Sequence, residues 1–150
     1  VVREGIQDVR GSLNRLRPGA LEGRTLKDAL EKMIREYQTL SKLQVDLHYE
    51  WVDVDMDVMI EDTIFRVIQE SMTNAVRHGH ASQMSLHFFE NEEDYLIELQ
   101  DNGVGFETLT YGYGLKQMME RISILGGQLQ FESRDGFFTR ISLPKYKEGR

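Results

Sequence analysis

The chain has 150 residues, the size of one ordinary domain; 40% of them are hydrophobic and 29% are charged, as in a soluble globular core. It contains no cysteine, which excludes disulfide frameworks and thiolate metal sites, and no apolar run approaches the roughly 18 residues of a membrane span. The formal net charge of −7 argues against a nucleic-acid surface but is compatible with a small nucleotide held by local donors and a metal ion.

The first residues predict a helix, because apolar positions recur at alternating spacings of four and three, which is a heptad seam, as far as Pro18. Such a short seam is either an amphipathic helix packed on its own domain or the tail of a longer helix whose partner helices are missing. We favour the second, and because Val1 is not an initiator Met we expect the chain to belong to a longer protein. The seam consists of Val2, Ile6, Val9, Leu13 and Leu16.

Thr25 predicts the N-cap of the next helix, with Asp28 at the capping-box position. Residues 43–49 alternate between apolar and polar side chains, which indicates a half-buried strand. An acidic turn then leads into a long amphipathic helix, Ile60 to His78, which Gly79 ends.

The second half of the chain predicts two hairpins that flank one more helix. Together with the preceding elements they make five strands and three domain helices, an α+β fold with the helices on one face of a mixed, largely antiparallel sheet. The predicted strands are 84–89, 95–100, 129–133 and 138–143, and the predicted helix is Leu115 to Leu125, closed by Gly126 and Gly127.

Three polar side chains interrupt the apolar pattern of the long helix. Glu70, Asn74 and His78 are spaced by four, so they line one edge of that helix, and Arg77 lies beside them. Taken alone, the row is compatible with a solvated surface. Asn74 would supply a neutral oxygen to Mg²⁺, which usually takes one or two protein ligands plus substrate phosphates, and Glu70 could hold metal-bound water or polarise a nucleophile.

A second polar pattern begins at Asp101, which ends a strand and is followed by Asn-Gly, a strong turn signal. No strand follows directly; Gly103 and Gly105 follow instead. Glycines let a backbone approach a flat ligand closely, and a carboxylate beside them can accept a hydrogen bond from an exocyclic amine such as that of adenine.

A third pattern consists of Gly112 and Gly114 before the predicted helix that starts at Leu115. Backbone N–H groups at a helix start suit phosphate, although a plain helix entry explains the same glycines. Residues 106–112 are then a candidate lid over a bound nucleotide. Each pattern is weak alone, but their order along the chain favours a nucleotide site.

In this order the motifs resemble those of the histidine-kinase ATP-binding domain, of the ATPase superfamily shared with gyrase, MutL and the heat-shock chaperone. The N box corresponds to ESMTNAVRH, the first glycine box to DNGVGF and the second to GYGLKQMMERISILGG. The pattern GLxxMxERxxxLGG resembles the sensor-kinase subfamily that works with LuxR/NarL-type response regulators. The resemblance implies the two-layer α/β sandwich of the GHKL type. Since RLRPGALEG resembles the subfamily's junction, it also implies the tail of the second dimerisation helix at 1–18 and the ATP-binding domain at 19–150.

Carried over residue by residue, the resemblance implies that Asn74 ligates Mg²⁺ and that Asp101 binds the adenine amino group. Glu70 occupies the position of the hydrolytic base in the gyrase-like relatives. The other ATP-binding positions that it implies are Arg77 facing the phosphates, His78 flanking the nucleotide, and Gly103, Gly105, Gly112, Gly114 and Leu115 in the glycine boxes.

The chain departs from the family pattern in two places. Many relatives carry Gly-Thr at the start of the last strand, whereas this chain has Gly136–Phe137, so no ligand is assigned there; Thr139 is on the same face but further along. The family's phosphoacceptor histidine lies on the first dimerisation helix, and none of the four histidines of this chain stands in that context.

The implied function is that of the catalytic ATP-binding domain of a two-component sensor histidine kinase, which donates the γ-phosphate of Mg²⁺·ATP to a histidine on the dimerisation domain for relay to a response-regulator aspartate. The implied partners are the dimerisation helices of a homodimer and a LuxR/NarL-type regulator. We expect a cytoplasmic domain of a protein of the bacterial cell membrane. Two alternatives stay open: an anti-sigma-type serine kinase, and a nucleotide-binding interaction module without kinase activity.

Overall fold

The computed structural model describes residues 21–145, apart from residues 22, 53 and 106–112. The predicted N-terminal helix, the 1–18 segment and the candidate lid therefore lie outside the part of the chain that the structure describes. The elements, in chain order, are helix α2 (Leu26–Ser41), strand β1 (Gln44–Tyr49), helix α3 (Val58–Arg77), strands β2 (Gln83–Glu90) and β3 (Asp94–Asp101), helix α4 (Tyr113–Ile124), and strands β4 (Gln128–Ser133) and β5 (Phe137–Pro144).

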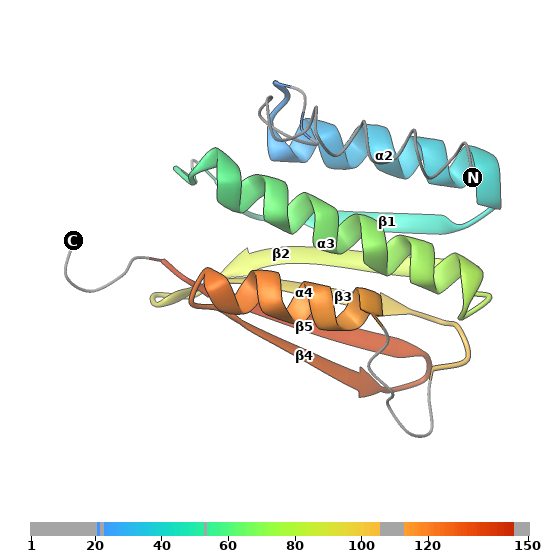
Figure 1. Ribbon diagram of the computed structural model, residues 1–150. Coiled ribbons are helices and arrows are strands. Elements are labelled where there is room, and N and C mark those ends of the chain that lie inside the picture. The colour runs from blue at the N-terminus through green and yellow to red at the C-terminus, as the bar shows by residue number, and fades with distance from the viewer. Residues whose placement is uncertain (1–20, 22, 53, 106–112, 146–150) are drawn as a thin grey trace, which may run out of the picture.

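The five strands form one mixed sheet with the order β1-β2-β3-β5-β4. Strands β1 and β2 are parallel, while the β2–β3, β3–β5 and β4–β5 pairs are antiparallel. Figure 1 shows α2, α3 and α4 side by side on one face of this sheet. The predicted α+β arrangement, with helices on one face of a largely antiparallel sheet, is confirmed for the described residues.

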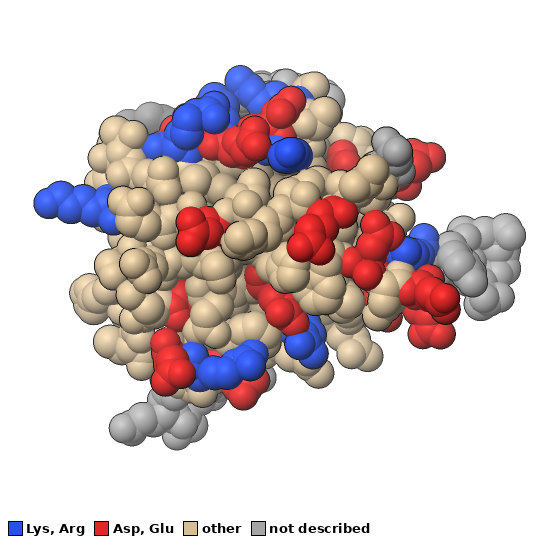
Figure 2. Space-filling view, turned by 180° about the vertical axis from the view of Figure 1, so that it is seen from behind, with Lys and Arg blue, Asp and Glu red and all other residues tan. Residues whose placement is uncertain are grey.

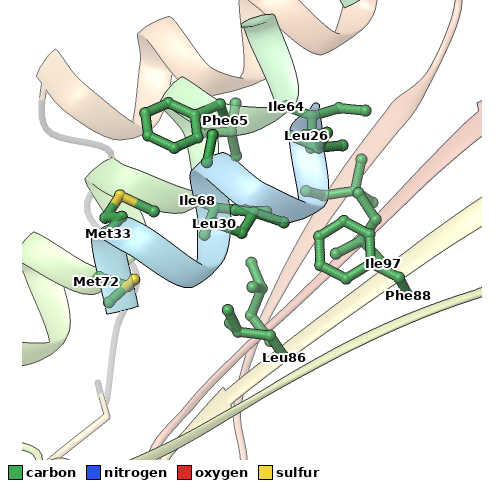
Figure 3. Close-up of a cluster of buried hydrophobic side chains, with 14 of the residues drawn as sticks. Leu26, Leu30, Met33, Ile64, Phe65, Ile68, Met72, Leu86, Phe88 and Ile97 are labelled. Carbon is green, nitrogen blue, oxygen red and sulfur yellow. The ribbon is translucent and has the colours of Figure 1, made fainter. Parts of the chain in front are cut away.

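The core lies between the helices and the sheet. Figure 3 shows Leu30 of α2 and Ile68 of α3 together with Leu86 and Phe88 of β2, and all four side chains are fully buried. Burial of each such side chain contributes about 1.5–3 kcal/mol relative to exposure, so this layer holds α3 firmly on the sheet. The position of the polar edge of α3 is therefore set by the packing of its apolar face.

Two helices begin earlier than the sequence predicted. Helix α3 begins at Val58 and not at Ile60, because the Asp57 side chain caps it by accepting a hydrogen bond from the Met59 N–H at 2.7 Å. Helix α4 begins at Tyr113 and not at Leu115, so that Gly114 lies in its first turn and does not precede the helix. The predicted Thr25 cap is confirmed, since Thr25 Oγ1 accepts from the Asp28 N–H at 3.1 Å.

The sheet face away from the helices is polar. Figure 2, the reverse of the view in Figure 1, shows acidic and basic side chains interspersed with uncharged ones. On this face Arg140 of β5 pairs with Glu98 of β3 across the two strands. None of the helices formed by the described residues combines the length and the apolarity that crossing a bilayer requires.

Candidate nucleotide-binding site

The loop that follows β3 is tied to the segment that follows α3. The Asn102 side-chain oxygen accepts hydrogen bonds from the backbone N–H groups of Ser82 at 2.9 Å and Gln83 at 3.0 Å. The Val104 N–H donates to the carbonyl oxygen of Gly79 at 3.0 Å. These bonds bring the end of the N-box helix and the first glycine box together, although the two motifs are separated in the sequence by the whole β2–β3 hairpin.

Asp101 is a carboxylate at a core-facing position. Along β3 the buried residues alternate, and Asp101 follows Ile97 and Leu99 on the helix side, with only 6% of its surface exposed. Burying a charge is costly unless it is hydrogen-bonded. Its Oδ1 accepts from the backbone N–H groups of Gly103 at 2.8 Å and Phe137 at 3.0 Å. The first of these bonds is the turn that the Asp-Asn-Gly pattern indicated, and the second is a tertiary contact.

Two glycines of the first glycine box are enclosed by neighbouring backbone. A Cβ on Gly103 would lie 2.5 Å from the Gly79 carbonyl oxygen. Gly105 has a φ of +68°, and a Cβ there would lie 2.6 Å from Ser133 Oγ and 2.7 Å from the Gly136 carbonyl oxygen. The loop therefore runs between the end of α3 on one side and the β4–β5 turn on the other.

The polar edge of α3 faces the second glycine box. Glu70 and Asn74 are half-buried, whereas Arg77 and His78 are exposed at the end of the helix. A Cβ on Gly114 would lie 3.1 Å from the carboxylate carbon of Glu70, so the first turn of α4 packs directly against that side chain.

The remaining predicted site residues that the structure describes lie at the end of α3 and the start of α4. The Asn74 carbonyl oxygen accepts from the N–H groups of His78 at 2.9 Å and Gly79 at 3.0 Å, which ends α3. Leu115 is half-buried against the core, and Gly112 lies outside the described residues. The structure thus gathers the other predicted site residues around the C-terminal half of α3, the loop after β3 and the start of α4.

Four further residues, which were not among the predicted site residues, also shape the site. Asn102 ties the loop to residues 82 and 83, and Phe137 contributes its backbone N–H. Gln100 and Gly136 contact the backbone of Asp101 from the sheet. The one signal in the sequence was Asn102 itself, as part of the Asp-Asn-Gly turn, whereas backbone donors and cross-strand contacts leave no mark in the residue pattern.

The donor chemistry of α3 fits Mg²⁺. Asn74 and Glu70 offer neutral and anionic oxygen, which hard cations prefer. Within the described residues there is no cluster of three or more histidine or acidic side chains that would hold a metal ion without other ligands. A cation at this edge could complete its coordination with water and with oxygens from a ligand such as the phosphates of a nucleotide.

Comparison with known proteins gives the family of the chain. Residues 59–147, which include α3 from its second residue, the loop after β3 and α4, match the family described as histidine kinase-, DNA gyrase B-, and HSP90-like ATPase. The chain belongs to this family. The predicted resemblance is thereby confirmed, and ATP binding is the activity that members of the family share.

Curated relatives of this ATPase domain are named as histidine kinases or sensor proteins. They include the signal transduction histidine-protein kinase/phosphatase UhpB of Salmonella typhimurium, which is 35% identical over 94% of this chain and 29% of its own length. The sensor histidine kinase LiaS of Bacillus subtilis is 32% identical over 93% of this chain and 39% of its length. The sensor protein VraS of Staphylococcus aureus is 30% identical over 95% of this chain and 42% of its length. The chain thus spans less than half the length of each of these relatives.

Solved structures show the same fold. A histidine kinase domain of the blue-light activated histidine kinase EL346 from Erythrobacter litoralis has a TM-score of 0.68 at 18% identity, covering 79% of this chain and 60% of that one. The histidine kinase AdeS of Acinetobacter baumannii has a TM-score of 0.70 at 20% identity, covering 81% of this chain and 64% of its own. The predicted GHKL-type α/β sandwich is confirmed by these neighbours.

Proposed function

We propose that this ATPase domain binds Mg²⁺·ATP between the polar edge of α3 and the loop after β3, and donates the γ-phosphoryl group to a histidine of a dimerisation domain. The observation that supports the proposal most directly is the set of bonds from Asn102 and Val104 to residues 79–83. These bonds bring the end of α3, which carries Asn74, close to the buried carboxylate of Asp101. A nucleotide, with a base at one end and phosphates at the other, requires both groups in one site.

Asp101 is the proposed adenine ligand. Its Oδ1 already accepts two backbone N–H groups, so we assign the adenine amino group to Oδ2. Gly103 and Gly105 shape the wall of the pocket, because without side chains the loop can pack directly on the backbone of Gly79 and Gly136.

The phosphates are assigned to the other end of the site. Asn74 would hold Mg²⁺, which when bound neutralises phosphate charge and orients the γ-phosphoryl group. Arg77 and His78 are exposed at the end of α3, where they can meet a ligand that enters from solvent. Gly112, Gly114 and Leu115 of the second glycine box are assigned to the phosphate side, with backbone N–H groups at the start of α4 as donors.

The proposed reaction is phosphoryl transfer, which depends mostly on positioning and charge neutralisation. A lone pair on the acceptor imidazole nitrogen forms a bond to the γ-phosphorus, and the bond from that phosphorus to the β–γ bridging oxygen breaks. ADP leaves with the electron pair, and the proton on the opposite ring nitrogen passes to a carboxylate or to solvent. Glu70 is the candidate general base, because its carboxylate lies beside the start of α4.

The acceptor is assigned to a segment outside this chain. None of the histidines at positions 48, 78, 80 and 87 stands in the sequence context of a phosphoacceptor. We propose that the acceptor lies on the dimerisation helices of a homodimer, that residues 1–18 are the tail of the second of these helices, and that a LuxR/NarL-type regulator receives the phosphoryl group. A parent protein in the bacterial cell membrane fits relatives that are named sensor proteins.

Incubation of the chain with ATP labelled at the γ-phosphate tests the proposal. The isolated chain should bind ATP and remain unlabelled, and a polypeptide that carries the upstream dimerisation helices should acquire label that acid removes, as expected for phosphohistidine. Stable label on the isolated chain would contradict the assignment of the acceptor. Acid-stable label on a partner protein would instead indicate a serine kinase of the anti-sigma type.

A further inference from the structure

The turn between β4 and β5 is bound to the backbone of Asp101 by one side chain. The Gln100 amide nitrogen donates to the carbonyl oxygen of Asp101 at 2.8 Å and to the carbonyl oxygen of Arg134 at 3.0 Å. Both acceptors are backbone oxygens, so an amide with two N–H groups suits this position. Gln100 therefore joins the strand that ends in the proposed adenine ligand to the turn that lies beside it.

Two further contacts bring the same turn against Asp101. Gly136 has a φ of +132°, and a Cβ there would lie 2.9 Å from the carbonyl carbon of Asp101. The next residue, Phe137, donates its N–H to Asp101 Oδ1 at 3.0 Å. The position of the turn thus decides whether Oδ1 keeps the second of its two backbone donors.

The Gln100 side chain reaches the turn from the polar face of the sheet. Gln100 pairs in register with Phe138 of β5, and the alternation along β3 places it on the face opposite to Asp101. The guanidinium of Arg134 covers the ring of Phe138 at 3.8 Å from the ring centroid. The backbone N–H of Arg134 donates to the carbonyl oxygen of Gly136 at 3.0 Å. Gln100 lies behind the site and does not face the proposed nucleotide.

We propose that Gln100 is a positioning residue for adenine recognition: its amide holds the β4–β5 turn so that the Phe137 N–H fixes one oxygen of Asp101 and directs the other toward the adenine amine. This inference rests on the proposed function. Without the amide, the turn loses one of its links to β3, the bond from Phe137 to Oδ1 weakens, and the Asp101 carboxylate is oriented less strictly. Recognition of the amine is then weakened, while the phosphate end of the site, on α3 and α4, is unaffected.

The test compares ATP with purine riboside triphosphate, which lacks only the 6-amino group, by calorimetric titration of the wild-type chain and two variants. Gln100→Met keeps the length of the side chain without its N–H donors, and Gln100→Ala removes the side chain. Gln130→Ala is the control, because Gln130 is an exposed glutamine on the edge strand β4, which does not pair with β3. The preference for ATP should fall about fivefold in both Gln100 variants, the effect of one hydrogen bond, and stay at the wild-type value in the control.

The ratio of the two dissociation constants separates positioning from general stability. An unchanged ratio in the Gln100 variants would overturn the proposed role of Gln100, whether or not the affinity for both nucleotides falls equally. A wild-type chain that binds both nucleotides equally well would overturn the adenine assignment of Asp101 and this inference with it. A wild-type chain that binds neither would overturn the proposed function itself.

Discussion

The backbone of Gly103 packs directly on the backbone of Gly79: a Cβ at Gly103 would lie 2.5 Å from the Gly79 oxygen and 3.0 Å from its Cα. Gly79 follows the C-cap of the helix that carries Asn74, and Gly103 belongs to the loop that follows Asp101. This contact therefore sets the separation between the two proposed ends of the nucleotide site. Even a single methyl group between the two backbones would move one motif away from the other.

Gly103→Ala is expected to lower the free energy of unfolding by about 1–3 kcal/mol, because the added methyl group overlaps fixed backbone atoms. ATP affinity should fall as well, since the loop must move away from α3. Urea denaturation and calorimetric titration measure the two effects. The control is Val104→Ala, a change in the next side chain, which is 73% exposed and should alter stability by less than about 0.5 kcal/mol. Wild-type stability and affinity in Gly103→Ala would show that the contact does not organise the site.

Asn74→Ala tests the metal end of the site. If Asn74 ligates Mg²⁺, ATP affinity in the presence of Mg²⁺ should fall about tenfold, as for loss of a metal-ligand contact, and affinity with EDTA should change little. Gln69→Ala provides a control on the exposed side of the same helix. Equal losses of affinity with and without Mg²⁺ would mean that Asn74 contacts the nucleotide or maintains the fold, and does not hold the metal.

Glu61→Gln is expected to stabilise the fold at neutral pH. Partial burial raises the pKa of Glu61 above its ordinary value of 4.5. Because the folded-state pKa is the higher one, the favourable contribution of this group is fully present below pH 4.5 and is lost as the pH rises through the folded-state pKa. Gln should therefore gain stability over Glu at pH 7, and the gain should shrink toward pH 4.

Thermal unfolding at both pH values checks this expectation, with Glu92→Gln in the exposed β2–β3 turn as a control for the loss of one negative charge. Glu61→Gln offers a second readout at Tyr49, whose pKa is raised to about 12, mainly by burial and to a smaller extent by the charge of Glu61. Removing that charge should lower the pKa of Tyr49 in an ultraviolet titration. A Glu61→Gln chain that is less stable than wild type at pH 7 would contradict the burial argument.

Much of the fold follows from local patterns in the sequence. The alternation of Val45, Leu47 and Tyr49 predicts β1 because one face of the strand packs under helices, and Thr25 caps α2 as its side chain allows. The starts of α3 and α4 were each predicted two residues late. At α3 the capping side chain is Asp57. Several aspartates lie in the turn before this helix, so the sequence does not single out which of them is the cap. Helix starts depend on single caps, whereas helix bodies depend on many residues.

The site was predictable where side chains act and unpredictable where backbone acts. Asp101 stands out as a carboxylate followed by glycines, and the structure places it at a buried, hydrogen-bonded strand end. The donor from Phe137 is a backbone N–H, so no residue type marks it. Gln100 has the alternation of an ordinary outward-facing strand residue, and its link to Arg134 exists only because β3 and β5 pair in their particular register.

The most direct test of the central claim is the dissociation constant of ATP for Asp101→Asn beside that of the wild-type chain, in Mg²⁺. Asparagine keeps an oxygen for the two backbone N–H groups, so the fold should survive, but it turns an NH₂ group toward the adenine amine. We predict that Asp101→Asn binds ATP at least about tenfold more weakly, with an unfolding midpoint close to that of wild type. Wild-type ATP affinity in this variant would show that adenine binds elsewhere on the molecule.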